Sequence, residues 1–106
     1  MRQRANEKEP RVYLLRIEHH IPSYNDWKTA FDNDPIGREK SGVRRHRIMR
    51  ATDDPDYVMI DLEFDGLAEA ESVLAALREL WGAVQPQGLI GGPQARIVET
   101  VEDRAY

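Results

Sequence analysis

Apolar and polar residues alternate along residues 57–64, which is typical of a β-strand with one buried face. Its apolar members are Val58, Ile60, Leu62 and Phe64. The segment Asp53–Asp56 before it favours a turn, because proline fixes φ and aspartate side chains bond the nearby backbone. An arginine-rich run, Val43 to Arg50, precedes that turn and is typical of an edge strand. Residues 42–64 therefore predict a β-hairpin.

A second alternating segment runs from Arg11 to His20 and predicts the first strand of the chain. One face carries Tyr13, Leu15, Ile17 and His19, and we expect it to be buried. The opposite face starts apolar and becomes polar along the strand. The segment therefore predicts a strand with one buried face.

Two segments have the spacing of amphipathic helices. In the first, Ser23 is the predicted N-cap and Asp26 completes a pattern similar to a capping box. A second short helix is expected after it, with Asp34 as the cap, Pro35 in the first turn and Gly42 just past the end.

The other amphipathic segment extends from Leu67 to about Trp81. Its apolar stripe consists of Ala70, Val73, Leu74, Leu77, Leu80 and Trp81. Residues Gly82 to Pro93 contain four glycines and two prolines and predict a loop.

The last predicted strand, Gln94–Val101, completes the order β-α-β-β-α-β, which is the ferredoxin-like plan. The expected fold class is therefore α+β. Four antiparallel strands should lie in the order 4-1-3-2, with both helices on one face of the sheet.

The chain has 106 residues, a mass of 12.2 kDa and an apolar fraction of 41%, which together fit one domain. We expect this domain at residues 11–102, between a disordered tail at 1–10 and a polar tail at 103–106. The absence of cysteine excludes disulfides, thiolate metal sites and a cysteine nucleophile. No apolar run approaches the about 20 residues of a membrane span, and no secretory signal is recognisable, so a cytoplasmic protein is expected.

The sheet face opposite the helices, called the open face below, is predicted to be half apolar and half charged. Its members on the two central strands are Val12, Leu14, Arg16, Glu18, His20, Tyr57, Met59, Asp61 and Glu63. One interpretation is a solvated surface with cross-strand ion pairs from Arg16 to Asp61 or Glu63. The other is a homodimer in which two such faces pack together, because the apolar half is large for an exposed surface.

Residues 27–65, followed by a helix rich in alanine and acidic residues, resemble small proteins of the dimeric α/β-barrel superfamily near the antibiotic biosynthesis monooxygenase-like proteins. The resemblance covers about residues 12–101, and it rests on Trp27-Lys28, Phe31-Asp32, Gly42-Val43 and Asp53-Asp54-Pro55. It implies a homodimer of ferredoxin-like units that closes an α/β barrel. One branch of the superfamily oxidises aromatic polyketides without metal or flavin, another degrades haem, and other members have no known activity. No catalytic motif of any branch matches this chain, so only the fold and the dimer carry over.

His19 is the candidate catalytic residue. It follows Leu15 and Ile17 on the buried face, at the strand end beside the first helix. One interpretation is a partly buried histidine with a structural hydrogen bond. The other is a general base that takes a proton from a phenol or an activated C–H group, since imidazole titrates near neutral pH.

Four aromatic side chains are candidates for substrate binding: Tyr24, Trp27, Phe31 and Trp81. An aromatic stripe at helical spacing usually packs in a core. The alternative is a small aromatic-lined pocket between helices and sheet, with the hydroxyl of Tyr24 at its rim.

No metal site is expected. Adjacent residues of a strand point to opposite faces, so His19 and His20 cannot share an ion. His46 is expected two strands away from them, about 10 Å at the usual strand spacing. No cofactor is predicted either, and the stretch Gly88–Pro93 lacks the phosphate-binding loop pattern.

Nucleic-acid binding is not expected, although RNA-recognition modules share the βαββαβ order. Those modules stack bases on aromatic residues of their central strands. Here the matching face has acidic residues with Tyr57 as its one aromatic side chain, no RNP1 pattern occurs, and the net charge is −4.

Three hypotheses for function follow. The first is a cofactor-independent monooxygenase-like enzyme that acts on a small aromatic or hydrophobic molecule. The second is a non-catalytic module that binds a small hydrophobic ligand or serves in a stress response. The third is a structural homodimer whose cavity is filled by its own side chains.

Overall fold

The computed structural model describes residues 12–84, 86 and 90–106. The predicted tail at 1–10 and Arg11, the expected start of the first strand, lie outside the described residues. The elements are β1 (Tyr13–His20), α2 (Tyr24–Asp32), β2 (Val43–Ala51), β3 (Asp54–Phe64), α3 (Leu67–Val84) and β4 (Gln94–Glu99).

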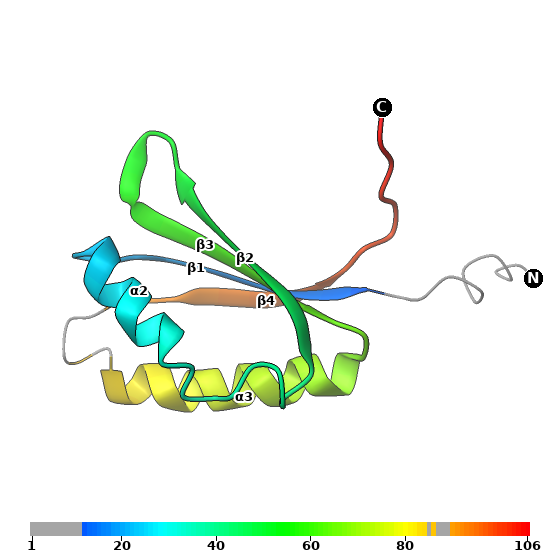
Figure 1. The fold of residues 1–106 in the computed structure, drawn as a ribbon, viewed down its shortest axis with the longest axis horizontal. Helices are drawn as coiled ribbons and strands as arrows, with labels where there is room; N and C mark the ends of the chain where they lie inside the picture. Colours follow the sequence, from blue (N-terminus) through cyan, green and yellow to red (C-terminus); the bar gives the residue numbers. More distant parts are fainter. Residues whose placement is uncertain (1–11, 85, 87–89) are drawn as a thin grey trace, which may run out of the picture.

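The four strands form one antiparallel sheet in the order β2-β3-β1-β4. This order confirms the predicted ferredoxin-like βαββαβ topology, with the first and third strands in the centre. The arginine-rich strand β2 lies at an edge, as expected from its charge. Figure 1 shows α2 and α3 on the same side of the sheet.

The core lies between the helices and the central strands. Leu15 pairs with Leu62 and Ile17 with Ile60, which places the apolar sets of β1 and β3 on the helical side of the sheet. The buried residues of this core are Leu15, Ile17, Ile21, Trp27, Val43, Val58, Ile60, Leu62, Phe64, Ala70, Val73 and Ile90. The alternation in the sequence therefore predicted the buried face of both central strands.

Helix α2 begins as predicted. Ser23 is its N-cap in an extended conformation, and its hydroxyl accepts a hydrogen bond from the backbone N–H of Asp26 at 3.3 Å. The helix ends at Asp32, and Trp27 is its buried residue.

The expected second helix after Asp34 is wrong, because residues 33–42 form a series of turns. Asp34 adopts φ +52°, which cannot begin a right-handed helix, and a residue before proline already disfavours helical angles. Its carboxylate accepts the backbone N–H of Arg38 at 2.9 Å instead. These turns carry Arg38 back to α2, where it contacts the ring of Phe31.

The predicted hairpin turn at Asp53–Asp56 is misplaced. The turn comprises Thr52 and Asp53, and β3 already begins at Asp54 and includes Pro55. At this end β3 extends beyond its last pair with β1, His20 with Tyr57, and Pro55 falls where the register with β2 shifts, between the pairs Arg50–Val58 and Ala51–Asp54. A proline, which has no N–H to donate, is tolerated at such a position.

Helix α3 is longer than expected, since it continues through Gly82 to Val84. Part of the predicted loop is therefore helical, and residues 85 and 87–89 of that loop lie outside the described residues. Strand β4 is shorter than expected. It ends at Glu99, and the side chain of Val101 is 88% exposed rather than part of the strand.

Candidate functional site

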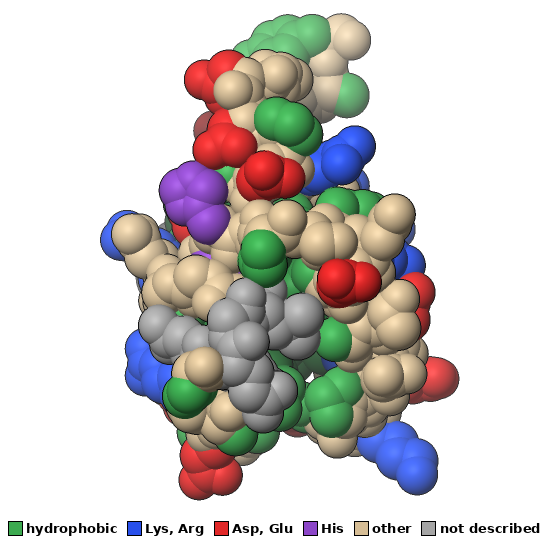
Figure 2. All heavy atoms as spheres, turned by 90° about the vertical axis from the view of Figure 1, so that its left-hand side faces the viewer, with side chains coloured by type: hydrophobic (Ala, Val, Ile, Leu, Met, Phe, Trp, Pro, Cys, Tyr) green, Lys and Arg blue, Asp and Glu red, His purple; other side chains and the backbone are tan. Residues whose placement is uncertain are grey.

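A cavity of about 290 Å³ lies between the two helices and the sheet. It is lined mainly by apolar side chains of β1, β3, α2 and α3, together with residues of the turns after α2. Its polar lining residues are His19, Asn33, Asp34 and Arg38. Figure 2 shows the end of the molecule where α3 ends, with acidic side chains toward the hairpin tip and hydrophobic side chains in the helical half.

Aromatic rings form one wall of this cavity. Trp27 and Phe31 lie on successive turns of α2, with ring centroids 5.2 Å apart and planes inclined by 33°. Trp81 lines the cavity from α3. These are three of the four aromatic residues proposed from the sequence, and both tryptophans of the chain belong to the wall.

Tyr24, the fourth, does not line the cavity. Its ring packs against Trp27, with the centroids 5.8 Å apart, and the guanidinium of Arg50 lies 4.8 Å from its ring centroid. Tyr24 therefore contacts the aromatic wall without lining the cavity.

His19 reaches the cavity from β1. Its side chain is 3% exposed, and its ring meets Trp27 edge to face at 6.1 Å. Its Nδ1 lies 3.1 Å from the carbonyl oxygen of His20. A carbonyl oxygen can only accept a hydrogen bond, so Nδ1 carries the proton in the neutral ring and Nε2 presents a lone pair.

Burial sets the protonation state of His19. The pKa of His19 is lowered mainly because the charged form would lose its hydration, while the hydrogen bond to the His20 carbonyl opposes this effect. A neutral imidazole with a free lone pair on Nε2 is the form that acts as a general base.

Arg38 supplies positive charge to the same cavity. Its guanidinium stacks over Phe31, 3.8 Å from the ring centroid, and donates a hydrogen bond to the Phe31 carbonyl oxygen at 3.0 Å. The nearest oxygen of Asp34 lies 3.6 Å away. Only 18% of the Arg38 side chain is exposed.

Arg38 has no signal in the sequence pattern, because the turns that position it have no helical or strand period. The contact of His46 with Phe31, whose ring centroids lie 5.1 Å apart, likewise has no such signal. His46 faces the helical side because it pairs with Leu62 of the buried set. Burial and the positive charges of Arg38 and Lys28 lower the pKa of His46.

The open face carries the ion pair expected from the sequence. Arg16 donates two hydrogen bonds to the carboxylate of Asp61, at 2.9 and 3.2 Å. Beside this pair, the hydroxyl of Tyr57 donates to Glu18 at 2.6 Å, which raises the pKa of Tyr57.

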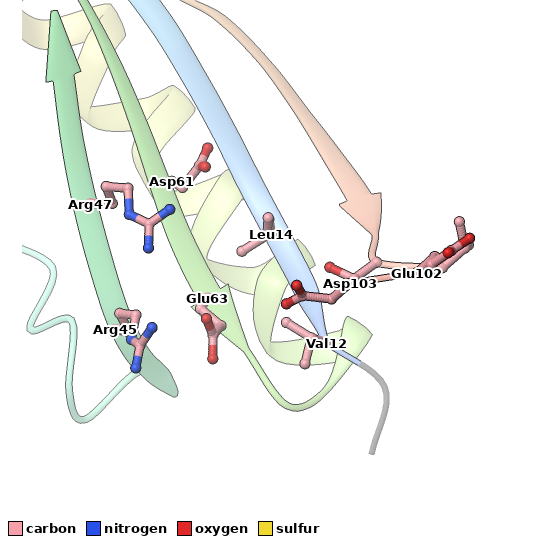
Figure 3. A pocket seen from close by; sticks show the side chains of 10 residues that line it. Val12, Leu14, Arg45, Arg47, Asp61, Glu63, Glu102 and Asp103 are labelled. Atoms are coloured by element: carbon pink, nitrogen blue, oxygen red, sulfur yellow. The ribbon is translucent and has the colours of Figure 1, made fainter. Parts of the chain in front are cut away.

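A second hollow, of about 480 Å³, lies on the open face next to the C-terminal segment. Figure 3 shows Arg45 and Arg47 of β2 beside the acids of β3, with Val12 and Leu14 on the other side. The hollow is largely lined by charged residues, unlike the cavity under the helices, which is mostly apolar.

Within the described ranges, no group of three or more histidine, aspartate or glutamate side chains is arranged to hold a metal ion. In the same part of the chain, no helix combines the length and the apolar character that crossing a bilayer requires.

Comparison with known proteins supports the fold and nothing finer. No protein-family model and no curated protein matches the sequence. Solved structures do match. A protein from Shewanella oneidensis has 15% identity and a TM-score of 0.67, over 87% of this chain and 93% of its own.

Two further structures share this arrangement. SnoaB, a cofactor-independent oxygenase from Streptomyces nogalater, has 12% identity and a TM-score of 0.67, over 90% of this chain and 97% of its own. A dimeric ferredoxin-like protein from an uncultured marine organism has 16% identity and a TM-score of 0.61, over 91% of this chain and all of its own, 100%. The predicted resemblance is therefore confirmed at the level of the fold.

Proposed function

We propose that the cavity under the helices binds a small aromatic or hydrophobic molecule and that His19 is the general base of a cofactor-independent, oxygenase-type reaction. One observation carries the proposal. A buried histidine with a lowered pKa lines an otherwise mostly apolar cavity, its Nδ1 is 3.1 Å from the His20 carbonyl oxygen, and its Nε2 has no hydrogen-bond partner among the described residues. The likeness in fold to a cofactor-independent oxygenase supports the same reaction class.

The size of the cavity limits the ligand. Ligand pockets usually measure about 300–1,000 Å³, so about 290 Å³ suits a molecule of one or two rings. Rings stacked against Trp27 and Phe31 gain both apolar burial and favourable ring geometry. A cavity filled by its own side chains, the third hypothesis from the sequence, is disfavoured by this volume.

In the proposed step, Nε2 of His19 removes a proton from a phenol hydroxyl or an activated C–H of the bound substrate. The resulting anion is electron-rich, and dioxygen is the co-substrate that oxidises it. One oxygen atom forms a bond to the activated carbon of the substrate, and the other leaves as water with the two hydrogens that the substrate loses. The mostly apolar lining strengthens the electrostatic part of proton transfer, because it screens charge less than water does. A general base typically contributes about 10²–10⁴ in rate.

The test is oxygen consumption with hydroquinone-type substrates. We expect His19→Ala to lower the turnover rate about a hundredfold or more. His20→Ala is the matched control, because it removes an exposed imidazole on the opposite face and keeps the His20 backbone carbonyl. Activity should also decline as pH falls through the lowered pKa of His19.

Full activity of His19→Ala would remove His19 from the mechanism. Binding of ligands without any oxygen consumption would instead favour the non-catalytic ligand-binding module. A cavity that takes up no small hydrophobic molecule would refute both functions.

We also propose that the chain is a homodimer through its open face. Leu14 and Met59 are half-buried there, and the hollow beside them is lined by arginines and acids that a second copy can pair. A structure with the same fold is dimeric.

A further inference from the structure

We propose that the cavity selects an aromatic carboxylate, with Arg38 as the residue that binds its anionic group. This inference rests on the proposed binding function of the cavity and adds the chemical class of the ligand. The observation that supports it is that the mostly buried guanidinium of Arg38 lies against Phe31, at the end of the aromatic wall.

The rings connect His19 to Arg38 in one series of contacts. His19 meets Trp27 at 6.1 Å, Trp27 meets Phe31 at 5.2 Å, and the Arg38 guanidinium lies 3.8 Å from the centroid of Phe31. His19, Arg38 and both intervening rings line the same cavity. A planar ligand lying along this wall has the general base at one end and the positive charge at the other.

Arg38 keeps hydrogen-bonding capacity for a ligand. Among the described residues, its side chain donates one hydrogen bond, from an Nη atom to the Phe31 carbonyl. Its separation from Asp34, 3.6 Å, is too long for a hydrogen bond. The Asp34 carboxylate is already occupied by the backbone N–H of Arg38, at 2.9 and 3.2 Å.

A carboxylate is the group that fits these donors. The planar fork of a guanidinium matches the two carboxylate oxygens, and such charge-assisted pairs are stronger than neutral hydrogen bonds. Contact with Phe31 fixes the guanidinium plane before a ligand arrives, which lowers the entropy cost of binding. The carboxylate of Asp34 is an ion-pair partner of Arg38 at 3.6 Å, and a ligand carboxylate would add the direct hydrogen bonds that this distance does not allow.

The experiment compares two probes with the same ring and chain, hydrocinnamate and hydrocinnamyl alcohol. Calorimetry gives both dissociation constants, and tryptophan fluorescence reports on occupancy of the cavity, because the only two tryptophans line it. We expect the carboxylate to bind about tenfold more tightly or better.

Two variants locate the effect. Arg38→Gln should remove the preference for the carboxylate and leave alcohol binding nearly unchanged. Arg47→Gln alters net charge equally on the open face and should leave the preference intact. If Arg38→Gln does not fold, the ratio of the two affinities in the unaltered protein still decides the matter.

The possible outcomes separate the two proposals. If neither probe binds or changes tryptophan fluorescence, the binding function itself fails. If both probes bind with equal affinity, the cavity is a binding site and the carboxylate preference is refuted. A preference that survives Arg38→Gln would refute the role of Arg38.

Discussion

Neighbouring histidines on β1 show how strongly a single position determines chemistry. His19 is buried against Trp27, and His20 is largely exposed, with its Nε2 3.1 Å from a carboxylate oxygen of Asp54. Successive strand residues point to opposite faces, so the side chain at position 19 faces the cavity and the side chain at position 20 faces solvent. The alternation in the sequence therefore predicted which of the two histidines faces the helices.

The lowered pKa of His19 makes stability depend on pH. Below the ordinary histidine value of about 6.5, the unfolded chain binds a proton that the folded chain refuses, so the free energy of unfolding falls as pH falls toward the lowered pKa. We expect His19→Gln to flatten this part of the stability curve, measured by denaturant unfolding between about pH 7 and pH 5, above most carboxylate titrations.

His46 contributes with the same sign, because its pKa is lowered too, so the slope should decrease without vanishing in the His19 variant. An unchanged slope in His19→Gln would contradict the assignment. Titration of the imidazole by NMR gives an independent reading in the unaltered protein.

At the scale of elements, the turns between α2 and β2 depend on residues with positive φ. Asp34, Gly37 and Gly42 have φ of +52°, +73° and +103°. These turns place Arg38 at the cavity and lead Val43 into the buried start of β2. Their conformation therefore links the site to the edge of the sheet.

Two glycines of this segment form a matched pair for mutation. A Cβ at Gly37 meets no atom within 4 Å, whereas a Cβ at Gly42 would lie 3.0 Å from Cγ and 3.1 Å from Cβ of Glu69 on α3. We expect Gly37→Ala to cost about 1 kcal/mol of unfolding free energy, from φ alone. Gly42→Ala should cost about 2–3 kcal/mol, because the helix cannot move away freely.

Chemical denaturation measures both differences. Equal losses for the two variants would mean that the contact with Glu69 relaxes at no cost. The affinity for hydrocinnamate provides a second measurement. A distorted turn segment would displace Arg38, so this affinity should fall more in Gly42→Ala than in Gly37→Ala.

At the scale of the whole molecule, the unresolved choice from the sequence is between a solvated open face and a homodimer. Leu14→Glu places a charge beside Glu63, its partner across the strands, and should break an interface on this face. Leu67→Glu is the control, because Leu67 is 43% exposed on α3, away from that face.

Light scattering distinguishes the two states. We expect a mass near twice 12.2 kDa for the unaltered chain and for Leu67→Glu, and 12.2 kDa for Leu14→Glu. A monomer at micromolar concentration in the unaltered chain would refute the homodimer, and the open face would then be a solvated surface.

The periodicity of the sequence predicts most residues of the candidate site, but it does not predict Arg38. The helical spacing of Trp27, Phe31 and Trp81 and the strand alternation that ends at His19 predict that all four side chains lie on the helical side of the sheet. The cavity lining agrees with this prediction. Arg38 is not predicted, because its position depends on the left-handed residue Asp34 and on contacts seven residues apart. Tyr24 belongs to the same helical stripe as Trp27, yet it contacts Trp27 and does not line the cavity.

The sequence by itself determined the order of elements, the edge position of β2 and the buried faces of the central strands, because side-chain periodicity follows directly from strand and helix geometry. Only the tertiary structure decided that an empty space remains under the helices, that Arg38 lines it, and that Nδ1 of His19 lies within hydrogen-bond distance of the His20 carbonyl. Those features depend on how side chains from segments far apart in the sequence pack together. A local sequence pattern does not predict that packing.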